Sequence, residues 1–259
     1  MTARLALEAA TVTYRQRGRG GLTAVDAVDL EVAAGEVVGL VGESGCGKST
    51  LARAVCGLEP LSSGRILFEG EPVQKLGVRS REERLRRIQM VFQNPYASLN
   101  PRRRVGAQIE DGRRVGGEKA PSTAELLASV GLDADAASRY PHQFSGGQRQ
   151  RVAIARAMAA GPDVLIGDEP IASLDASLQS RVAALMRQVA LDSGASLLFI
   201  SHDLAVVRAI ADRIAVMQAG RIVEQGPAEQ VWASPQHPYT RRLLAAIPIA
   251  DGEGRLPVV

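Results

Sequence analysis

The sequence predicts an α/β fold whose core carries an N-terminal antiparallel β-subdomain and an inserted α-helical subdomain. Three observations support this fold class. Residues 4–14 and 22–32 alternate apolar and polar side chains, which indicates two strands joined by a polar loop at 15–21. Residues 104–140 have a polar, helical pattern with no further strand. Three apolar runs have polar residues at or just after their C-terminal ends: 36–41, 164–169 and 196–200. Buried strands of an α/β core that binds a ligand show this pattern.

Composition limits the function classes. The 259 residues fit one large domain or two small ones, and 46% hydrophobic and 23% charged residues are ordinary for a globular protein. Two cysteines give no disulfide framework, so we expect a reducing cytoplasm. We expect neither a signal peptide nor a membrane helix, which needs about 18 apolar residues. Net charge is +3, but mixed charges in the arginine-rich stretch 79–87 and only 3% aromatic residues argue against nucleic acid as a partner.

The clearest motif is a glycine-rich stretch, Gly42–Thr50, between the predicted strand 36–41 and a predicted helix at 51–56. Strand, glycine-rich turn and helix start are the context of a phosphate-binding P-loop. Its backbone N–H groups and the helix dipole would surround an anion. Lys48 would reach the β- and γ-phosphates, and the Ser49 hydroxyl would bind Mg²⁺. Only three of the 31 basic residues are lysine, so a lysine here favours a site that needs a compact point charge over an ordinary turn.

Two residues upstream of the inserted helices have open interpretations. Tyr14 ends the first predicted strand, where it is either an amphipathic strand-end residue or a surface on which adenine stacks. Gln93 follows the predicted strand 88–92, at the strand end where α/β proteins bind ligands. It is therefore a candidate ligand for Mg²⁺ or water, and otherwise a polar residue that begins a loop.

The inserted region has two recognisable helix starts. Ser122 and Glu125 fit a capping box. Ser145 is a predicted N-cap for a helix that covers 149–160, and Gly146 and Gly147 leave backbone N–H groups accessible. This second helix end could bind an anion, although an ordinary helix start would have the same residues.

Polar residues also follow the later strands. Asp168 and Glu169 end the strand 164–169, where Asp168 would hold Mg²⁺ and Glu169 would orient or deprotonate water. Two adjacent carboxylates at a buried strand end are costly without a cation. Asp175 is a predicted N-cap for a helix at 176–190. His202 follows the strand 196–200, and strand order would place it beside the γ-phosphate, although a lone loop histidine is usually structural. Further on, a hairpin at 213–224, a short helix with Trp232 and an amphipathic segment at 241–247 are predicted.

In this order and spacing, the motifs resemble the ATP-binding subunits of ABC transporters over nearly the whole chain. Phe144–Gln148 corresponds to that family's signature sequence, with phenylalanine in place of leucine. The resemblance implies a P-loop NTPase (RecA-like) core, with ATP and Mg²⁺ as ligands. It implies catalytic roles for Lys48, Gln93, Glu169 and His202. It implies ATP contacts from Tyr14, Gly42, Ser44, Gly45, Cys46, Gly47, Lys48, Ser49, Thr50, Gln93, Asp168 and His202, and Mg²⁺ contacts from Ser49, Gln93 and Asp168. It also implies that a second subunit contacts the same ATP with its Ser145, Gly146, Gly147, Gln148 and Asp175.

A narrower resemblance is to the oligopeptide, dipeptide and nickel importers. It rests on the stretches Gly42–Thr50, Val91–Arg102 and His237–Arg241. Some members have a cysteine cluster in an extended tail; this chain has no cysteine after Cys56, so we expect no iron–sulfur site. The expected organisation is an ATP-binding domain at 1–235, with a helical subdomain at roughly 95–160, and a C-terminal extension at 236–259.

The resemblance implies a head-to-tail dimer in which each signature helix covers the ATP on the opposing P-loop. The expected partners are a second ATP-binding subunit, two membrane permease subunits contacted near Gln93–Arg104, and, indirectly, an extracytoplasmic solute-binding protein. The expected location is peripheral, at the cytoplasmic face of the cell membrane. The cargo and the choice between homo- and heterodimer do not follow from the sequence.

Two other functions fit a P-loop but not the rest of this sequence. A GTPase would normally read guanine with an Asn-Lys-x-Asp loop, but neither Asn94 nor Asn100 precedes a lysine. A non-transport ABC ATPase acting on nucleic acid or ribosomes usually has fused ATPase halves, a long coiled-coil insertion or zinc cysteines. None of these is present in this sequence, so transport is the preferred interpretation.

Overall fold

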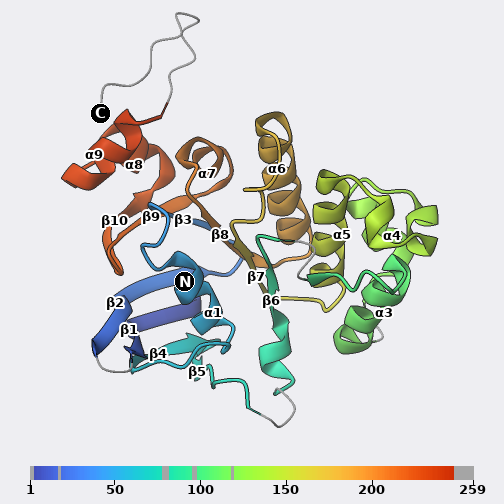
Figure 1. Cartoon of the computed structure of the whole chain (residues 1–259), viewed down its shortest axis with the longest axis horizontal. Coiled ribbons are helices and arrows are strands. Elements are labelled where there is room, and N and C mark those ends of the chain that lie inside the picture. Colours follow the sequence, from blue (N-terminus) through green and yellow to red (C-terminus); the bar gives the residue numbers. More distant parts are fainter. Residues whose placement is uncertain (1–2, 17–18, 78–81, 95–97, 118–119, 248–259) are drawn as a thin grey trace, which may run out of the picture.

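The computed structural model describes residues 3–16, 19–77, 82–94, 98–117 and 120–247. Two sheets and their helices form the layers seen in Figure 1. The N-terminal sheet is antiparallel, with strand order β2-β1-β4-β5. Its strands are β1 (Ala3–Gln16), β2 (Arg19–Ala33), β4 (Ser63–Phe68) and β5 (Glu71–Pro72).

The second sheet has the order β10-β9-β3-β8-β7-β6, and only the edge pair β9–β10 is antiparallel. Its strands are β3 (Val37–Val41), β6 (Ile88–Val91), β7 (Val164–Asp168), β8 (Ser196–Ser201), β9 (Arg213–Gln218) and β10 (Arg221–Pro227). Because β3, β8 and β7 are parallel neighbours, their carboxyl ends meet at one edge of the sheet. This edge is where an α/β fold binds its ligands.

Both faces of the parallel sheet are buried. On β3, Val37 and Val41 belong to the core that packs against the later helices, while Val38 and Leu40 belong to the core under the N-terminal sheet. Helix α1 (Lys48–Val55) lies in this second core, between the two sheets. Alternate side chains of one strand thus fill two cores, which explains its uninterrupted apolar sequence.

The helices between β6 and β7 form a separate helical group beside the parallel sheet, at the right of Figure 1. They are α3 (Val105–Gly116), α4 (Thr123–Ser129) and α5 (Gly146–Met158). The predicted capping box at Ser122 is confirmed: the Glu125 N–H donates to the Ser122 hydroxyl at 3.2 Å, and the Ser122 N–H donates to the Glu125 carboxylate at 2.7 Å. Other helices in the described residues are α6 (Ala176–Asp192), α7 (Leu204–Ile210), α8 (Ala228–Ala233) and α9 (Pro238–Ala245). Short 3₁₀ turns lie at Arg84–Arg87, Ala134–Ser138 and Pro141–Gln143.

Two of the predicted boundaries were wrong. The loop predicted at 15–21 is shorter, because β1 and β2 continue to pair through Gln16 and Arg19; residues 17–18 lie outside the described residues. Helix α5 begins at Gly146, not at 149, because Ser145 and Gln148 form a capping box that makes the two glycines between them the first helical residues. The predicted N-cap position of Asp175 is confirmed, since α6 begins at Ala176, although the Asp175 side chain makes no capping hydrogen bond.

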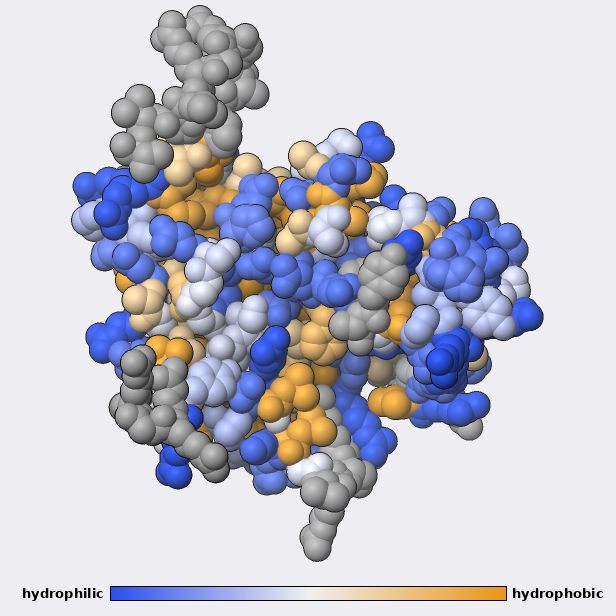
Figure 2. All heavy atoms as spheres, in the orientation of Figure 1, coloured by the Kyte–Doolittle hydropathy of each residue, from blue (hydrophilic) through white to orange (hydrophobic). Residues whose placement is uncertain are grey.

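The surface on the side shown in Figure 2 is mainly hydrophilic, with hydrophobic residues in separate patches. Among the described residues, no helix combines the length and apolar character needed to cross a membrane.

Candidate functional site

The P-loop lies at the carboxyl end of β3 and leads directly into α1. Lys48 is buried, and its ammonium group donates to the carbonyls of Gly42 at 2.8 Å and Glu43 at 2.9 Å. It also lies 3.6 Å from the Glu169 carboxylate. The lysine charge is thus held inside the curve of the loop, against the backbone carbonyls of the loop's first two residues.

Two glycines of the loop are required by its shape. Gly42 has φ +156° and Gly47 has φ +111°. A side chain at Gly42 would come within 2.2 Å of the Met217 carbonyl oxygen, and one at Gly47 within 2.1 Å of the Ala24 carbonyl oxygen. Only glycine allows this conformation and this close approach to neighbouring backbone.

Ser49 and Asp168 meet beside the loop. The Ser49 hydroxyl donates to the Asp168 carboxylate at 2.7 Å. Burial raises the pKa of Asp168, and the hydrogen bond from Ser49 opposes that shift. A hydroxyl oxygen next to a largely buried carboxylate is a donor set that suits Mg²⁺, which binds few protein oxygens and keeps several waters.

Glu169 connects the P-loop with His202. One carboxylate oxygen lies 3.6 Å from the Lys48 ammonium, and the other lies 3.5 Å from His202 Nδ1. Glu169 has φ +46°, a left-handed conformation that costs energy for a residue with a side chain. Strained residues cluster at functional positions, and the Glu169 carboxylate, directly after β7, lies close to both Lys48 and His202.

A pocket of about 460 Å³ is formed around the P-loop. The predicted residues that line it are Tyr14, Ser44, Gly45, Gly47, Lys48, Ser49, Thr50, Gln93 and Glu169. The Tyr14 and Thr50 hydroxyls are 3.4 Å apart, which places the tyrosine over the start of α1. Four residues predicted for this site do not line the pocket, and one of them is Asp168, which is buried beside Ser49. Gly42 and His202 line an adjacent pocket, and Cys46 is buried, where burial raises the pKa of its thiol.

The signature residues lie elsewhere. Ser145 caps α5, with the Gln148 N–H donating to its hydroxyl at 3.3 Å, and residues 145–148 do not line the pocket around the P-loop. Figure 1 shows α1 and α5 on opposite sides of β6 and β7. A methyl group added to Gly146 would lie 3.7 Å from Leu174, so the signature segment borders the segment that precedes α6. One subunit therefore does not bring its own signature segment to its own P-loop.

The sequence and fold of this chain are similar to those of known ATP-binding proteins. The family described as ABC transporter matches residues 25–172, more than half of the chain. The chain belongs to the ABC transporter family. It is an ATP-binding ATPase of this family, and the matched residues contain the P-loop, Gln93, the signature segment, Asp168 and Glu169. A second family, described as the oligopeptide/dipeptide transporter C-terminal region, matches residues 223–258.

Individual ABC proteins resemble the chain over most of its length. The oligopeptide transport ATP-binding protein OppF of Bacillus subtilis is 48% identical over 242 residues, which cover 90% of this chain and 79% of that protein. A putative peptide import ATP-binding protein of Brucella ovis is 46% identical over 239 residues, covering 90% and 75%.

Two solved structures share the ABC fold. CbiO1 of Clostridium perfringens, described as part of the transporter complex CbiONQ, has a TM-score of 0.76 and 29% identity, and the match covers 90% of this chain and 92% of that one. A dimeric ATP-binding cassette in a post-hydrolysis state with ADP and Pi has a TM-score of 0.72 and 27% identity, covering 86% and 98%.

Three residues that lie beside the P-loop were not predicted as site residues from the sequence. Leu22 and Ala24 of β2 line the pocket opposite the P-loop. Their alternation in β2 could have indicated that they share a face of the strand, but not which face turns to the loop. Tyr239 of α9 lies in the stretch His237–Arg241, and no signal in that stretch predicts that the Glu43 N–H donates to its hydroxyl at 3.0 Å.

Proposed function

We propose that this chain is the ATP-binding subunit of an ABC importer that takes up oligopeptides or dipeptides through partner membrane subunits. One observation carries the proposal: the ABC transporter match at 25–172 and the oligopeptide/dipeptide transporter C-terminal match at 223–258 occur in the same chain. The names of the relatives, oligopeptide transport and peptide import ATP-binding proteins, support the same cargo class. Nickel or a related small solute is the other cargo in this resemblance.

The proposed ATP site is the pocket around Lys48. The lysine and the loop amides would bind the β- and γ-phosphates, and the Tyr14 ring would support the base. Glu169, between Lys48 and His202, would accept a proton from the attacking water, while His202 orients the water and the γ-phosphate. Ser49, Asp168 and Gln93 would hold Mg²⁺, which offsets phosphate charge when bound. Asp175 and residues 145–148 would act on the ATP of the other subunit.

The subunit would work as a head-to-tail dimer. The separation of the signature segment from its own P-loop supports this arrangement, as does the dimeric state of a solved relative. ATP would join the two subunits, and hydrolysis would release them. Its place would be peripheral, at the cytoplasmic face of the membrane, with contacts to two permease subunits near Gln93–Arg104. Residues 95–97 of that segment lie outside the described residues.

Affinity purification from the native cell tests the transport assignment. A tagged chain recovered in mild detergent should bring down membrane permeases, and solute-binding protein should join them when cargo is present. Loss of the gene should abolish uptake of labelled di- or oligopeptides and leave uptake of free amino acids unchanged. Recovery of ribosomes or DNA without permeases would favour the non-transport alternative. A defect in nickel uptake alone would reassign the cargo.

Gly147→Asp tests the signature segment. The carboxylate suits a helix N-terminus, and Gly147 has no positive φ, so folding should be retained. A negative charge facing the partner's triphosphate should reduce ATPase activity at least about tenfold, because like charges repel strongly in a buried interface. ATP binding to the variant's own P-loop should persist. Gly147→Ala is the matched neutral control.

Mixing variants tests the head-to-tail arrangement. When Gly147→Asp is combined with Lys48→Ala, a mixed dimer contains one site with both segments intact, so part of the activity should return. If the mixture stays inactive although mixed dimers form, each subunit completes its own site and the arrangement is wrong.

A further inference from the structure

The start of helix α9 is held in a fixed position by β10. The Glu224 carboxylate accepts hydrogen bonds from the Gln236 N–H at 2.7 Å and the His237 N–H at 3.0 Å. His237 then caps α9, since its Nδ1 accepts from the Tyr239 N–H at 3.2 Å. These bonds leave the first turn of the helix little freedom.

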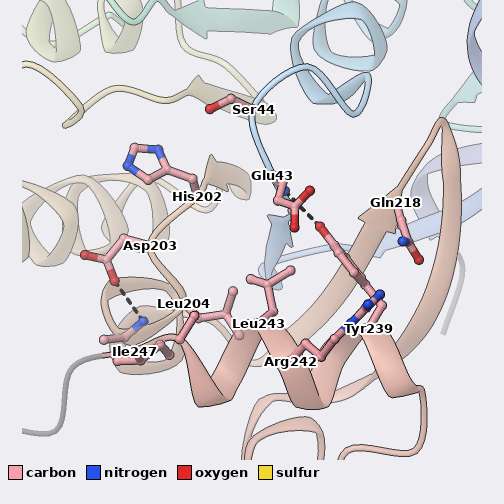
Figure 3. Close-up of a pocket in the computed structure, with 13 residues that line it drawn as sticks. Glu43, Ser44, His202, Asp203, Leu204, Gln218, Tyr239, Arg242, Leu243 and Ile247 are labelled. Carbon is pink, nitrogen blue, oxygen red and sulfur yellow. Dashed lines mark hydrogen bonds between the residues drawn. The ribbon is translucent and has the colours of Figure 1, made fainter. Parts of the chain in front are cut away.

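The first turn of α9 carries Tyr239 to the P-loop. The side chain is only 3% exposed, and its hydroxyl accepts a hydrogen bond from the Glu43 N–H at 3.0 Å (Figure 3). Burial raises the pKa of Tyr239, so the phenol stays neutral. Glu43 is the second residue of the loop, and this bond supplies its N–H with a partner from the far end of the chain.

Tyr239 and Lys48 hold the same peptide group from opposite ends. The peptide bond between Gly42 and Glu43 has its C=O bonded to the Lys48 ammonium at 2.8 Å and its N–H bonded to Tyr239. No cis peptide occurs among the described residues, so these two groups point in opposite directions. Hydrogen bonds at the two ends of one amide also polarise each other. Any shift of Tyr239 would therefore change where the lysine charge lies.

A cavity of about 970 Å³ lies beside this contact and is lined by α9, the P-loop and the segment after β8. The P-loop lines it with Glu43 and Ser44, the segment after β8 with His202 and Leu204, and α9 with Leu243. Figure 3 shows these residues around the pocket, with Leu204 and Leu243 close to each other and the His202 ring turned away from them. Helix α9 therefore faces two parts of the ATPase site, but Tyr239 makes the hydrogen bond to the P-loop.

We propose that Tyr239 is a positioning residue of the ATP site, which fixes the Gly42–Glu43 peptide and through it the Lys48 ammonium. The region after β10 is then part of the ATPase itself, in addition to any role in assembly. This inference rests on the proposed placement of ATP at the P-loop. It does not require Tyr239 to touch the nucleotide.

Tyr239→Phe is the test, because it keeps the buried ring and removes only the hydroxyl. The purified variant should bind Mg-ATP about three- to tenfold more weakly in calorimetric titration, the effect of losing one hydrogen bond. KM for ATP should rise in step, with a smaller change in kcat. Tyr140→Phe is the matched control: it removes a phenol in the helical group, lines neither pocket and should bind as the parent does.

The outcomes distinguish failure of this inference from failure of the proposed ATP site. If Tyr239→Phe lowers the melting temperature but leaves ATP affinity and KM unchanged, Tyr239 is only a structural anchor and the inference is wrong. Equal weakening in Tyr140→Phe would also overturn it, since the effect would not be specific. If Lys48→Ala keeps parental ATP binding, the placement of ATP itself is wrong and the inference fails with it. Loss of binding in Lys48→Ala beside parental binding in Tyr239→Phe refutes the inference alone.

Discussion

Replacement of Lys48 by alanine is expected to have the largest effect on ATP binding of any single change. Lys48 is the basic residue buried inside the P-loop, and its ammonium is already oriented by the carbonyls of Gly42 and Glu43. Charge-assisted hydrogen bonds to phosphate are worth about 1.5–3 kcal/mol, so affinity should fall about 10- to 100-fold. Calorimetry with Mg-ATP measures this directly.

A matched control is available in Lys75→Ala. Lys75 is an exposed lysine in the segment after β5, so the same substitution removes the same charge away from the site. It should leave ATP binding and the melting temperature close to those of the parent. If Lys48→Ala binds ATP as well as Lys75→Ala does, the phosphate site is not the P-loop.

Glu169→Gln should have the largest effect on hydrolysis. The amide keeps the shape of the side chain but cannot accept a proton from water, and removal of a general base typically costs about 10²–10⁴ in rate. ATP binding should persist, because Lys48 and the loop are unchanged. The variant should therefore accumulate as an ATP-bound dimer, which gel filtration with and without Mg-ATP would detect.

Glu71→Gln is the control for Glu169→Gln. Glu71 is exposed at the edge of the N-terminal sheet, and the same change there should leave turnover at the parental rate. Hydrolysis by Glu169→Gln at the rate of this control would show that another group activates the water. His202, 3.5 Å from Glu169, would then be the next residue to substitute.

The features that could be predicted from the sequence are those set by local chemistry. The glycines of the P-loop, the lysine that follows them and the carboxylates at the end of β7 are defined by residues close in the chain. The structure places Lys48, Ser49 and Glu169 around one pocket, as the order of buried strands indicated. The capping box at Ser122 was predictable for the same reason: both partners lie within one helical turn.

The features that could not be predicted depend on distant packing. Tyr239 lies 196 positions from Glu43, and nothing near it in the sequence shows that α9 returns to the P-loop. The extension of β1 and β2 through residues 15–16 and 19–21 depends on pairing between the two strands, which the residue pattern alone did not show. Asp175 has the right residue type and position for a cap, yet its side chain makes no capping bond.

The position of β3 in the sheet has a consequence for biosynthesis. This wholly apolar strand lies between β8 and β9, which begin at residues 196 and 213. At about 5–20 residues per second, a ribosome needs on the order of ten seconds to make the intervening chain. During that time β3 has neither of its partners, and an unpaired apolar strand can associate with other nascent chains. The nascent protein should therefore depend on ribosome-associated chaperones until β9 has emerged, and fragments that end before β8 should aggregate.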